Sequence, residues 1–218
     1  MKYNQPKNPL GGLPVIKVAL LFFLITSMIG CGRNTSREDF PVDDHCNTTD
    51  QAPIGPYYIS GTPETTFLNY QNQPGFTMTI SGVVYDIDEN PIASAQIEVW
   101  HADSSGTYQP GGNGDASEYD PEQLNLRGTF TTDASGRYQL TSIQPGLLGT
   151  RRRHIYWRIV APGSKTLVTQ TYWLSERLDE RDLNATEDKP TEICRYLDFQ
   201  VSGEGVLSAT FDIYLEAE

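Results

Sequence analysis

The segment His154-Ile155-Tyr156 places two side chains of metal-binding type one residue apart. It lies in an apolar stretch typical of a strand, and alternate residues of a strand project from the same face. The imidazole and the phenol are therefore expected to point at one site. A phenolate is a hard anionic donor that suits Fe(III). The alternative is that His154 is a hydrogen-bonded strand histidine and Tyr156 an ordinary sandwich aromatic.

Short strands separated by turn residues must position these side chains. The last one alternates apolar and polar residues, and a turn with proline follows the first. About seven such strands favour an all-β, antiparallel β-sandwich with long loops and little helix. The strands are expected at Met78–Tyr85, Ala95–Trp100, Gly128–Thr132, Tyr138–Thr141, His154–Val160, Leu167–Trp173 and Leu207–Leu215.

Two long loops and one short helix complete the expected domain. The loops run over residues 109–125 and 144–152. Long loops on a rigid sandwich are where functional sites tend to be built. Ser175 is a suitable N-cap for a helix over residues 175–183.

An ordered set of motifs resembles the intradiol ring-cleavage dioxygenase family. The set covers most of the segment from residue 55 to residue 218, which is expected to form one domain. That family has a sandwich core of transthyretin-like type. The motifs are Gly55-Pro56-Tyr57-Tyr58, Ser81–Asp86, Pro91, Ala95–Tyr108, Arg127-Gly128, Thr132–Tyr138, Pro145-Gly146, Arg151, His154 and Leu167–Tyr172.

The resemblance implies a non-haem Fe(III) held by two tyrosinates and two histidines. Tyr108 matches the first tyrosine and His154 the first histidine. The second tyrosine is expected where this chain has Leu148, and the second histidine where it has Tyr156. The candidate metal ligands are therefore Tyr108, His154 and Tyr156, and three ligands can hold iron with open positions.

The same resemblance implies O2-dependent cleavage of a catechol-type aromatic ring between its two hydroxyl carbons. Arg151 and Gln170 match the family's arginine and glutamine near the substrate, where they would steady anionic charge. Two other readings stay open. One is a metal-free, non-catalytic family member that binds a ligand at the cell surface. The other is a transthyretin-like structural or carrier domain.

The net charge and the N-terminal segment indicate which partners and which compartment to expect. The 218-residue chain carries a net charge of −12, which makes nucleic acid an unexpected partner. Residues 1–30 read as a signal peptide with three lysines and an apolar run too short to span a membrane. Cys31 follows it as in a bacterial lipoprotein, and the alternative is an ordinary signal peptide or a membrane anchor with a free cysteine nearby. Residues 31–54 then form a polar tether, which places the protein outside the cytoplasm on a lipid anchor in the cell envelope.

Two further cysteines, Cys46 and Cys194, remain beyond the signal segment. Export leads to an oxidising compartment, where a disulfide between them is expected. The alternative is two separate thiols, because spacing alone does not show that they meet.

Overall fold

One sheet carries the strand that begins at His154. The computed structural model describes residues 48–176 and 193–218. Neighbouring strands of this sheet are antiparallel except the last pair, which is parallel. In spatial order the strands are β5 (Arg127–Thr131), β3 (Gln96–Trp100), β7 (His154–Val160), β8 (Leu167–Trp173) and β9 (Tyr196–Leu197).

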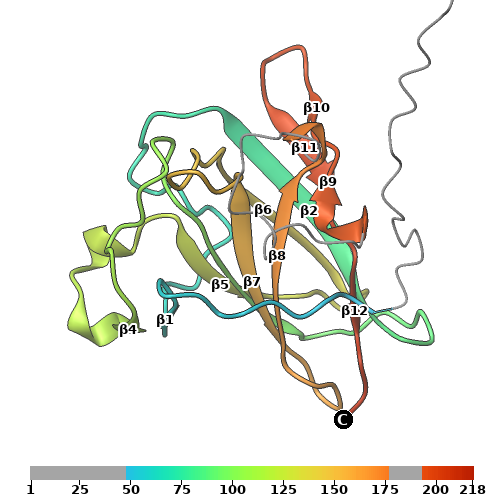
Figure 1. Cartoon of the computed structure of the whole chain (residues 1–218). Helices are drawn as coiled ribbons and strands as arrows, with labels where there is room; N and C mark the ends of the chain where they lie inside the picture. Colours follow the sequence, from blue (N-terminus) through green and yellow to red (C-terminus); the bar gives the residue numbers. More distant parts are fainter. Residues whose placement is uncertain (1–47, 177–192) are drawn as a thin grey trace, which may run out of the picture. The chain divides into compact units, whose positions relative to one another are not determined.

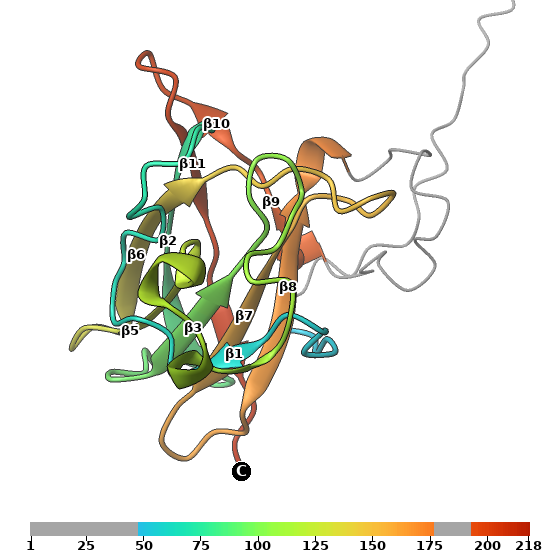
Figure 2. The same ribbon diagram turned by 90° about the vertical axis from the view of Figure 1, so that its left-hand side faces the viewer.

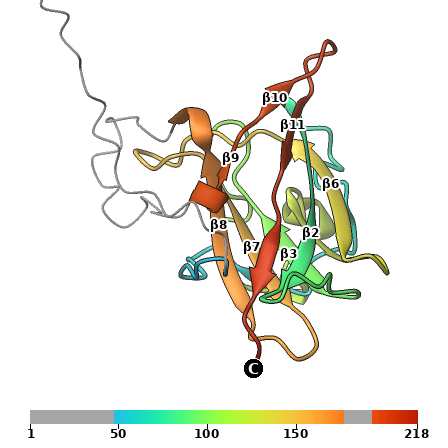
Figure 3. The ribbon, with the colours of Figure 1, turned by 90° about the vertical axis from the view of Figure 1, so that its right-hand side faces the viewer.

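The second sheet is organised around the long strand β2 (Thr77–Asp86), as Figures 1 and 3 show. β6 (Arg137–Ile143) pairs antiparallel with β2. β11 (Leu207–Thr210) and β12 (Ile213–Leu215) pair with β2 in the parallel direction, and β10 (Gln200–Val201) adds to β11. The predicted sandwich is confirmed, but its sheets are mixed rather than purely antiparallel.

The predicted last strand is divided into β11 and β12 at Phe211 and Asp212. Side chains interrupt the ladder there. The Tyr138 hydroxyl donates to the Phe211 carbonyl at 2.5 Å, and an Asp212 carboxylate oxygen accepts the Val83 amide at 2.9 Å. Phe211 is buried, whereas Leu207 is only half-buried. The alternation was therefore predicted correctly, but the break was not, because it depends on contacts with β2 and β6.

The hydrophobic core lies between the two sheets. β7 contributes Ile155, Trp157 and Ile159, all with 0 % exposure, and β2 contributes Met78 and Ile80. Side chains of a strand alternate between faces. The remaining residues of β7 therefore lie on the outer face of their sheet, away from the core.

Two segments outside the main sheets, around residue 58 and at 109–125, cover that outer face. β1 (Ile59–Ser60) and β4 (Gly114–Asp115) pair in parallel, and Figure 2 shows β1 in front of β3 and β7. Two 3-10 turns, η1 (Ala116–Glu118) and η2 (Pro121–Leu124), follow β4. The outer face is thus enclosed by the segment around residue 58 and the loop at 109–125, as a site would require.

Helix is limited to single turns in the part of the chain that the structure describes. η3 (Leu174–Glu176) begins where the helix was predicted, and the rest of that prediction, residues 177–183, lies outside the described residues. η4 (Ile193–Arg195) precedes β9. No helix within residues 48–176 and 193–218 is long and apolar enough to cross a membrane.

Candidate metal centre

Strand β7 presents His154 and Tyr156 on the outer face of its sheet, as the spacing predicted. Both residues are buried, at 3 % and 2 % exposure. Their rings meet edge to face with centroids 5.3 Å apart. The register places Tyr156 between Trp100 of β3 and Gln170 of β8.

Tyr108 reaches the same face from the loop that follows β3. Asp103 shapes this loop, because its carboxylate accepts the backbone amides of Ser105 at 2.9 Å and Thr107 at 3.0 Å. The Asp103 carbonyl accepts the Gly146 amide at 2.7 Å. The loop carrying Tyr108 is therefore attached to the loop that carries Leu148.

The Tyr108 hydroxyl lies 3.3 Å from His154 Nε2, although the two residues are 46 positions apart in sequence. His154 Nδ1 is 2.7 Å from the Arg152 carbonyl. A carbonyl can only accept, so Nδ1 carries the proton and Nε2 presents its lone pair. Metal-binding histidines are commonly oriented by such a bond from the other ring nitrogen. Tyr108 and His154 therefore converge in a form suited to bind a cation.

Tyr156 is held by packing and not by its hydroxyl. Its ring stacks on Trp100 with centroids 5.1 Å apart and planes 4° apart. Gly55 approaches so closely that a Cβ there would lie 2.6 Å from the Tyr156 hydroxyl oxygen. Within the described residues this hydroxyl makes no hydrogen bond. The Tyr156 oxygen is thus not engaged by any other described residue.

Leu148 packs against this aromatic cluster of Trp100, Tyr108 and Tyr156. It is half-buried and sits in a tight turn in which the Arg151 amide donates to its carbonyl at 2.9 Å. A leucine side chain cannot bind a cation. The position that the resemblance assigns to a second tyrosinate is therefore filled by an apolar contact.

Burial raises the pKa of the Tyr108 phenol far above its ordinary value, and the neighbouring Tyr156 adds to the effect. The positive charges of Arg127 and Arg151 act in the opposite direction but are weaker. The phenol is therefore neutral at pH 7 unless a cation competes for its proton. Metal coordination supplies such a competitor, since a bound cation strongly favours the anionic form of its ligand.

Arg151 and Gln170 lie beside the centre and contact each other. Arg151 Nη2 donates to Gln170 Oε1 at 3.2 Å, and the Tyr172 hydroxyl donates to the same oxygen at 3.2 Å. Tyr172 pairs in register with His154. The two predicted substrate-side residues are thus neighbours, and Gln170 orients the guanidinium.

Two other ring side chains, His101 and Tyr138, have structural roles. His101 is buried, with Nδ1 2.7 Å from the Ala102 carbonyl and Nε2 2.7 Å from the Ser142 hydroxyl. Burial lowers the pKa of His101 to about 4. Tyr138 packs in the core and bonds to Phe211. Neither side chain is directed at Tyr108.

Two residues to which the sequence assigned no role at the metal, Tyr57 and Arg127, complete the surroundings of Tyr108. Tyr57 stacks on Tyr108 with centroids 4.1 Å apart and planes 9° apart. The Arg127 guanidinium lies over the Tyr108 ring, with its Cζ 6.0 Å from the ring centroid. Tyr57 and Arg127 both belong to motifs that carry the resemblance, but the sequence gives neither of them a contact with Tyr108.

The predicted lipidation residue Cys31 lies outside the described residues, as do residues 1–30 and most of the tether. Cys194 is disulfide-bonded. Its predicted partner, Cys46, lies outside the described residues, so the pairing stays a prediction. Residues 48–176 and 193–218 contain no group of three His, Cys, Asp or Glu side chains that could hold a metal ion. Any metal at this centre would depend on the phenols.

This chain is similar to known dioxygenases in sequence and in structure. A family model described as "Dioxygenase" matches residues 54–217. The catechol 1,2-dioxygenase of Candida albicans is 31% identical over 151 residues, which is 59% of this chain and 48% of that protein. The hydroxyquinol 1,2-dioxygenase of Nocardioides simplex is 26% identical over 181 residues, which is 74% of this chain and 59% of that protein. The chain spans about half the length of the curated relatives it matches.

Among solved structures, the dioxygenase domain of a dioxygenase and carbohydrate-binding protein fusion from Streptomyces sp. SirexAA-E is similar to this chain. It has 28% sequence identity and a TM-score of 0.64, over 78% of this chain and 99% of that domain.

Proposed function

The chain belongs to the intradiol ring-cleavage dioxygenase family, and from this premise we propose that it is an Fe(III)-dependent enzyme that opens a catechol-type ring. The cut falls between the two hydroxyl carbons, with O2 as co-substrate. The family uses non-haem Fe(III) and binds catechol-type substrates and O2. The proposed metal ligands are Tyr108, His154 and Tyr156.

The observation that carries the proposal is the 3.3 Å approach of the Tyr108 hydroxyl to His154 Nε2. Two donors that each bind one ion at about 2 Å and about a right angle to each other lie about 3 Å apart. The orientation of His154, whose Nδ1 bonds to the Arg152 carbonyl so that Nε2 faces Tyr108, supports the same set.

The protein's own residues would orient and balance the substrate. Bound Fe(III) would supply Lewis-acid polarisation of the catechol oxygens. Arg151, oriented by Gln170, would stabilise the negative charge of the deprotonated diol. Because the chain has one imidazole fewer and retains two phenols, its ligands would bring the same negative charge as the family set.

Purified protein from iron-replete medium tests this proposal. We expect about one iron per chain, a visible band from tyrosinate-to-iron charge transfer, and O2 uptake with catechol. Tyr119→Phe is a matched control, because its hydroxyl bonds only to the Asn113 carbonyl in the covering loop. Colourless, iron-free protein would count against the enzyme.

Leu148 favours a second candidate function, a metal-free member that binds an aromatic ligand without turnover. Its side chain packs where the family pattern has a ligand. The double variant Leu148→Tyr with Tyr156→His restores the family pattern. If it binds iron and the native chain does not, the chain is a non-catalytic binding module. If the native chain already binds iron, the second candidate is removed.

We also propose that the protein is exported and held on the cell envelope by acyl chains on Cys31. The signal-like residues 1–30 and the polar tether support this. Lipid labelling of the wild type and of Cys31→Ser is the test. Label that persists in the variant, or a variant that stays with the membrane, would contradict the anchor. Mass mapping without reduction would test the bridge between Cys46 and Cys194.

A further inference from the structure

Arg127 buries a full positive charge beside the candidate centre. Its side chain is 1 % exposed. Nη1 donates to the Tyr57 carbonyl at 2.6 Å, Nε to the Gln109 carbonyl at 3.4 Å, and Nη2 to the Pro110 carbonyl at 3.4 Å. Across the described part of the chain no carboxylate pairs with it. The guanidinium thus has three neutral partners and no counter-charge.

Such an arrangement is costly for a residue with a purely structural task. Burial of an ion without a counter-ion is unfavourable, and neutral donors can satisfy carbonyls at lower cost. Burial lowers the pKa of Arg127 to about 10, so the residue nevertheless remains charged at neutral pH. A planar fork that reaches three carbonyls is something only arginine provides.

All three carbonyls belong to segments that hold Tyr108. Tyr57 lies against the Tyr108 ring in the stacked pair. Gln109 and Pro110 directly follow Tyr108 in the chain. The guanidinium itself lies 6.0 Å from the Tyr108 ring centroid. One side chain therefore restrains the ring through its stacking partner, through its own backbone and through direct contact.

We propose that Arg127 is a positioning residue that orients the Tyr108 ring, so that its hydroxyl faces His154 Nε2. The inference rests on the proposed function, because that orientation matters only if the two side chains share a metal ion. Arg127 is 1 % exposed, and the partners of its guanidinium among the described residues are backbone carbonyls. It acts through Tyr108 by joining Tyr57 to the loop after Tyr108.

The test compares Arg127→Lys and Arg127→Met with Arg158→Met, a control on the same sheet face. Each protein is loaded with Fe(III) and examined by electron paramagnetic resonance, by its charge-transfer band and by a competition assay for Fe(III) affinity. Urea unfolding is measured in parallel. Loss of residues that orient a ligand weakens metal binding about 10- to 100-fold. We expect that loss, and several ferric species in place of one, in both Arg127 variants.

Arg158→Met is expected to keep the wild-type ferric signal even where its unfolding midpoint falls. Arg127→Lys retains the charge but cannot reach three carbonyls, so a wild-type signal in that variant would overturn the inference. Arg127 variants that lose stability yet keep the ferric signal and affinity would overturn it as well, since the role would then be structural only. A wild type that takes up no Fe(III) overturns the proposed function first and this inference with it.

Discussion

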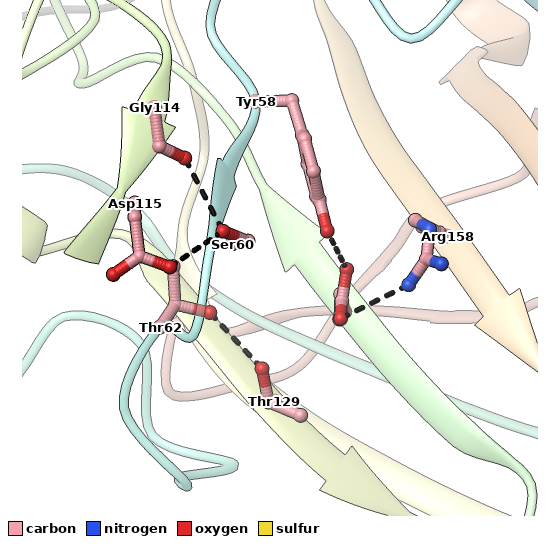
Figure 4. Close-up of polar contacts among 8 residues, drawn as sticks. Tyr58, Ser60, Thr62, Gly114, Asp115, Thr129 and Arg158 are labelled. Atoms are coloured by element: carbon pink, nitrogen blue, oxygen red, sulfur yellow. Dashed lines mark hydrogen bonds and ion pairs between the residues drawn. The ribbon is translucent and has the colours of Figure 1, made fainter.

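Two arginine–tyrosine pairs lie on the outer face of the same sheet, and they differ in one respect. Arg127 Cζ lies 6.0 Å from the Tyr108 ring centroid, and Arg158 Cζ lies 5.9 Å from that of Tyr58. Glu98 accepts Arg158 Nη1 at 3.1 Å and the Tyr58 hydroxyl at 2.8 Å, as Figure 4 shows. The charge of Arg158 is balanced by a carboxylate, whereas that of Arg127 is not.

This difference indicates that the Tyr58 pair attaches the covering segment to the sheet, whereas the Tyr108 pair belongs to the candidate site. Around Tyr58, further bonds of Ser60 to Asp115 and of Thr62 to Thr129 attach the covering segment to its neighbours (Figure 4). The polar side chains of Tyr58, Glu98 and Arg158 there are bonded to one another. Around Tyr108, a positive charge and an unbonded phenol of Tyr156 remain for something the protein does not itself supply. Ionised Tyr108 and Tyr156 would supply the negative charge that Arg127 lacks, and the proposed Fe(III) would favour that ionised form.

The largest expected effect comes from removing one phenol oxygen in each pair. Tyr108→Phe should abolish Fe(III) colour and weaken Fe(III) binding by more than the roughly 10- to 100-fold typical of residues that only support a ligand. Tyr58→Phe should leave Fe(III) binding unchanged and cost about 1 kcal/mol in urea unfolding, from one lost hydrogen bond. Equal iron contents in the two variants would remove the distinction between the pairs.

The strands could be predicted from sequence because a period of two is a local property. The bounds of β7 and β8, His154–Val160 and Leu167–Trp173, agree with the structure. The direction of β11 and β12 could not be predicted. Both pair with β2 over more than a hundred residues of sequence separation, and Asp212 and Tyr138 decide where the ladder breaks.

The candidate site could be predicted from the sequence only in part. Alternation on a strand suffices to place His154 and Tyr156 on one face, and the family resemblance pointed to Tyr108. Arg127 belongs to the motifs of the resemblance, but its role could not be predicted, because its burial arises only when Tyr57 and the loop after Tyr108 close over it. Its position directly before a β5 glycine resembles that of any exposed arginine at a strand end. Long-range closure of this kind leaves no local pattern.

Acid pH should sharpen the comparison through His101, which lies near Arg127 and not near Arg158. Burial lowers the pKa of His101 to about 4, and the charge of Arg127 adds to the effect. The unfolded chain takes up a proton at about pH 6.5, whereas the native state does not until about pH 4. Stability should therefore decrease as pH falls through this window, by about 1.4 kcal/mol per pH unit.

Urea unfolding between pH 7 and pH 4.5 measures this slope. His101→Gln has no titrating ring and should be flatter over the same range. A slope in the variant as steep as that of the wild type would show that other groups carry the acid sensitivity.

Removal of the Glu98 carboxylate should make the Arg158–Tyr58 pair resemble the Arg127–Tyr108 pair, because both arginines would then lack a counter-charge. Glu98→Gln keeps an acceptor for Tyr58 but leaves Arg158 without its carboxylate. We expect a loss of about 1 to 3 kcal/mol in urea unfolding, as for hydrogen bonds to charged groups. In the Arg158→Met background the same substitution should cost less, because the two changes act on one contact. Additive losses would show that Glu98 and Arg158 do not stabilise each other.

The smallest expected effect lies at alkaline pH and concerns Tyr58. Burial, together with the hydrogen bond and the charge of Glu98, raises its pKa to about 12. Because the folded pKa exceeds the unfolded value of about 10, the stabilisation is complete below pH 10 and is lost as pH rises towards 12. Absorbance titration of Glu98→Gln should show the Tyr58 phenol ionising at lower pH than in the wild type. Removing Arg158 instead should move that ionisation upwards, since its charge lowers the same pKa. Opposite shifts from the two partners of one contact would establish that this tyrosine is neutral and bonded within the protein, which is the state that Tyr108 must leave to bind a metal.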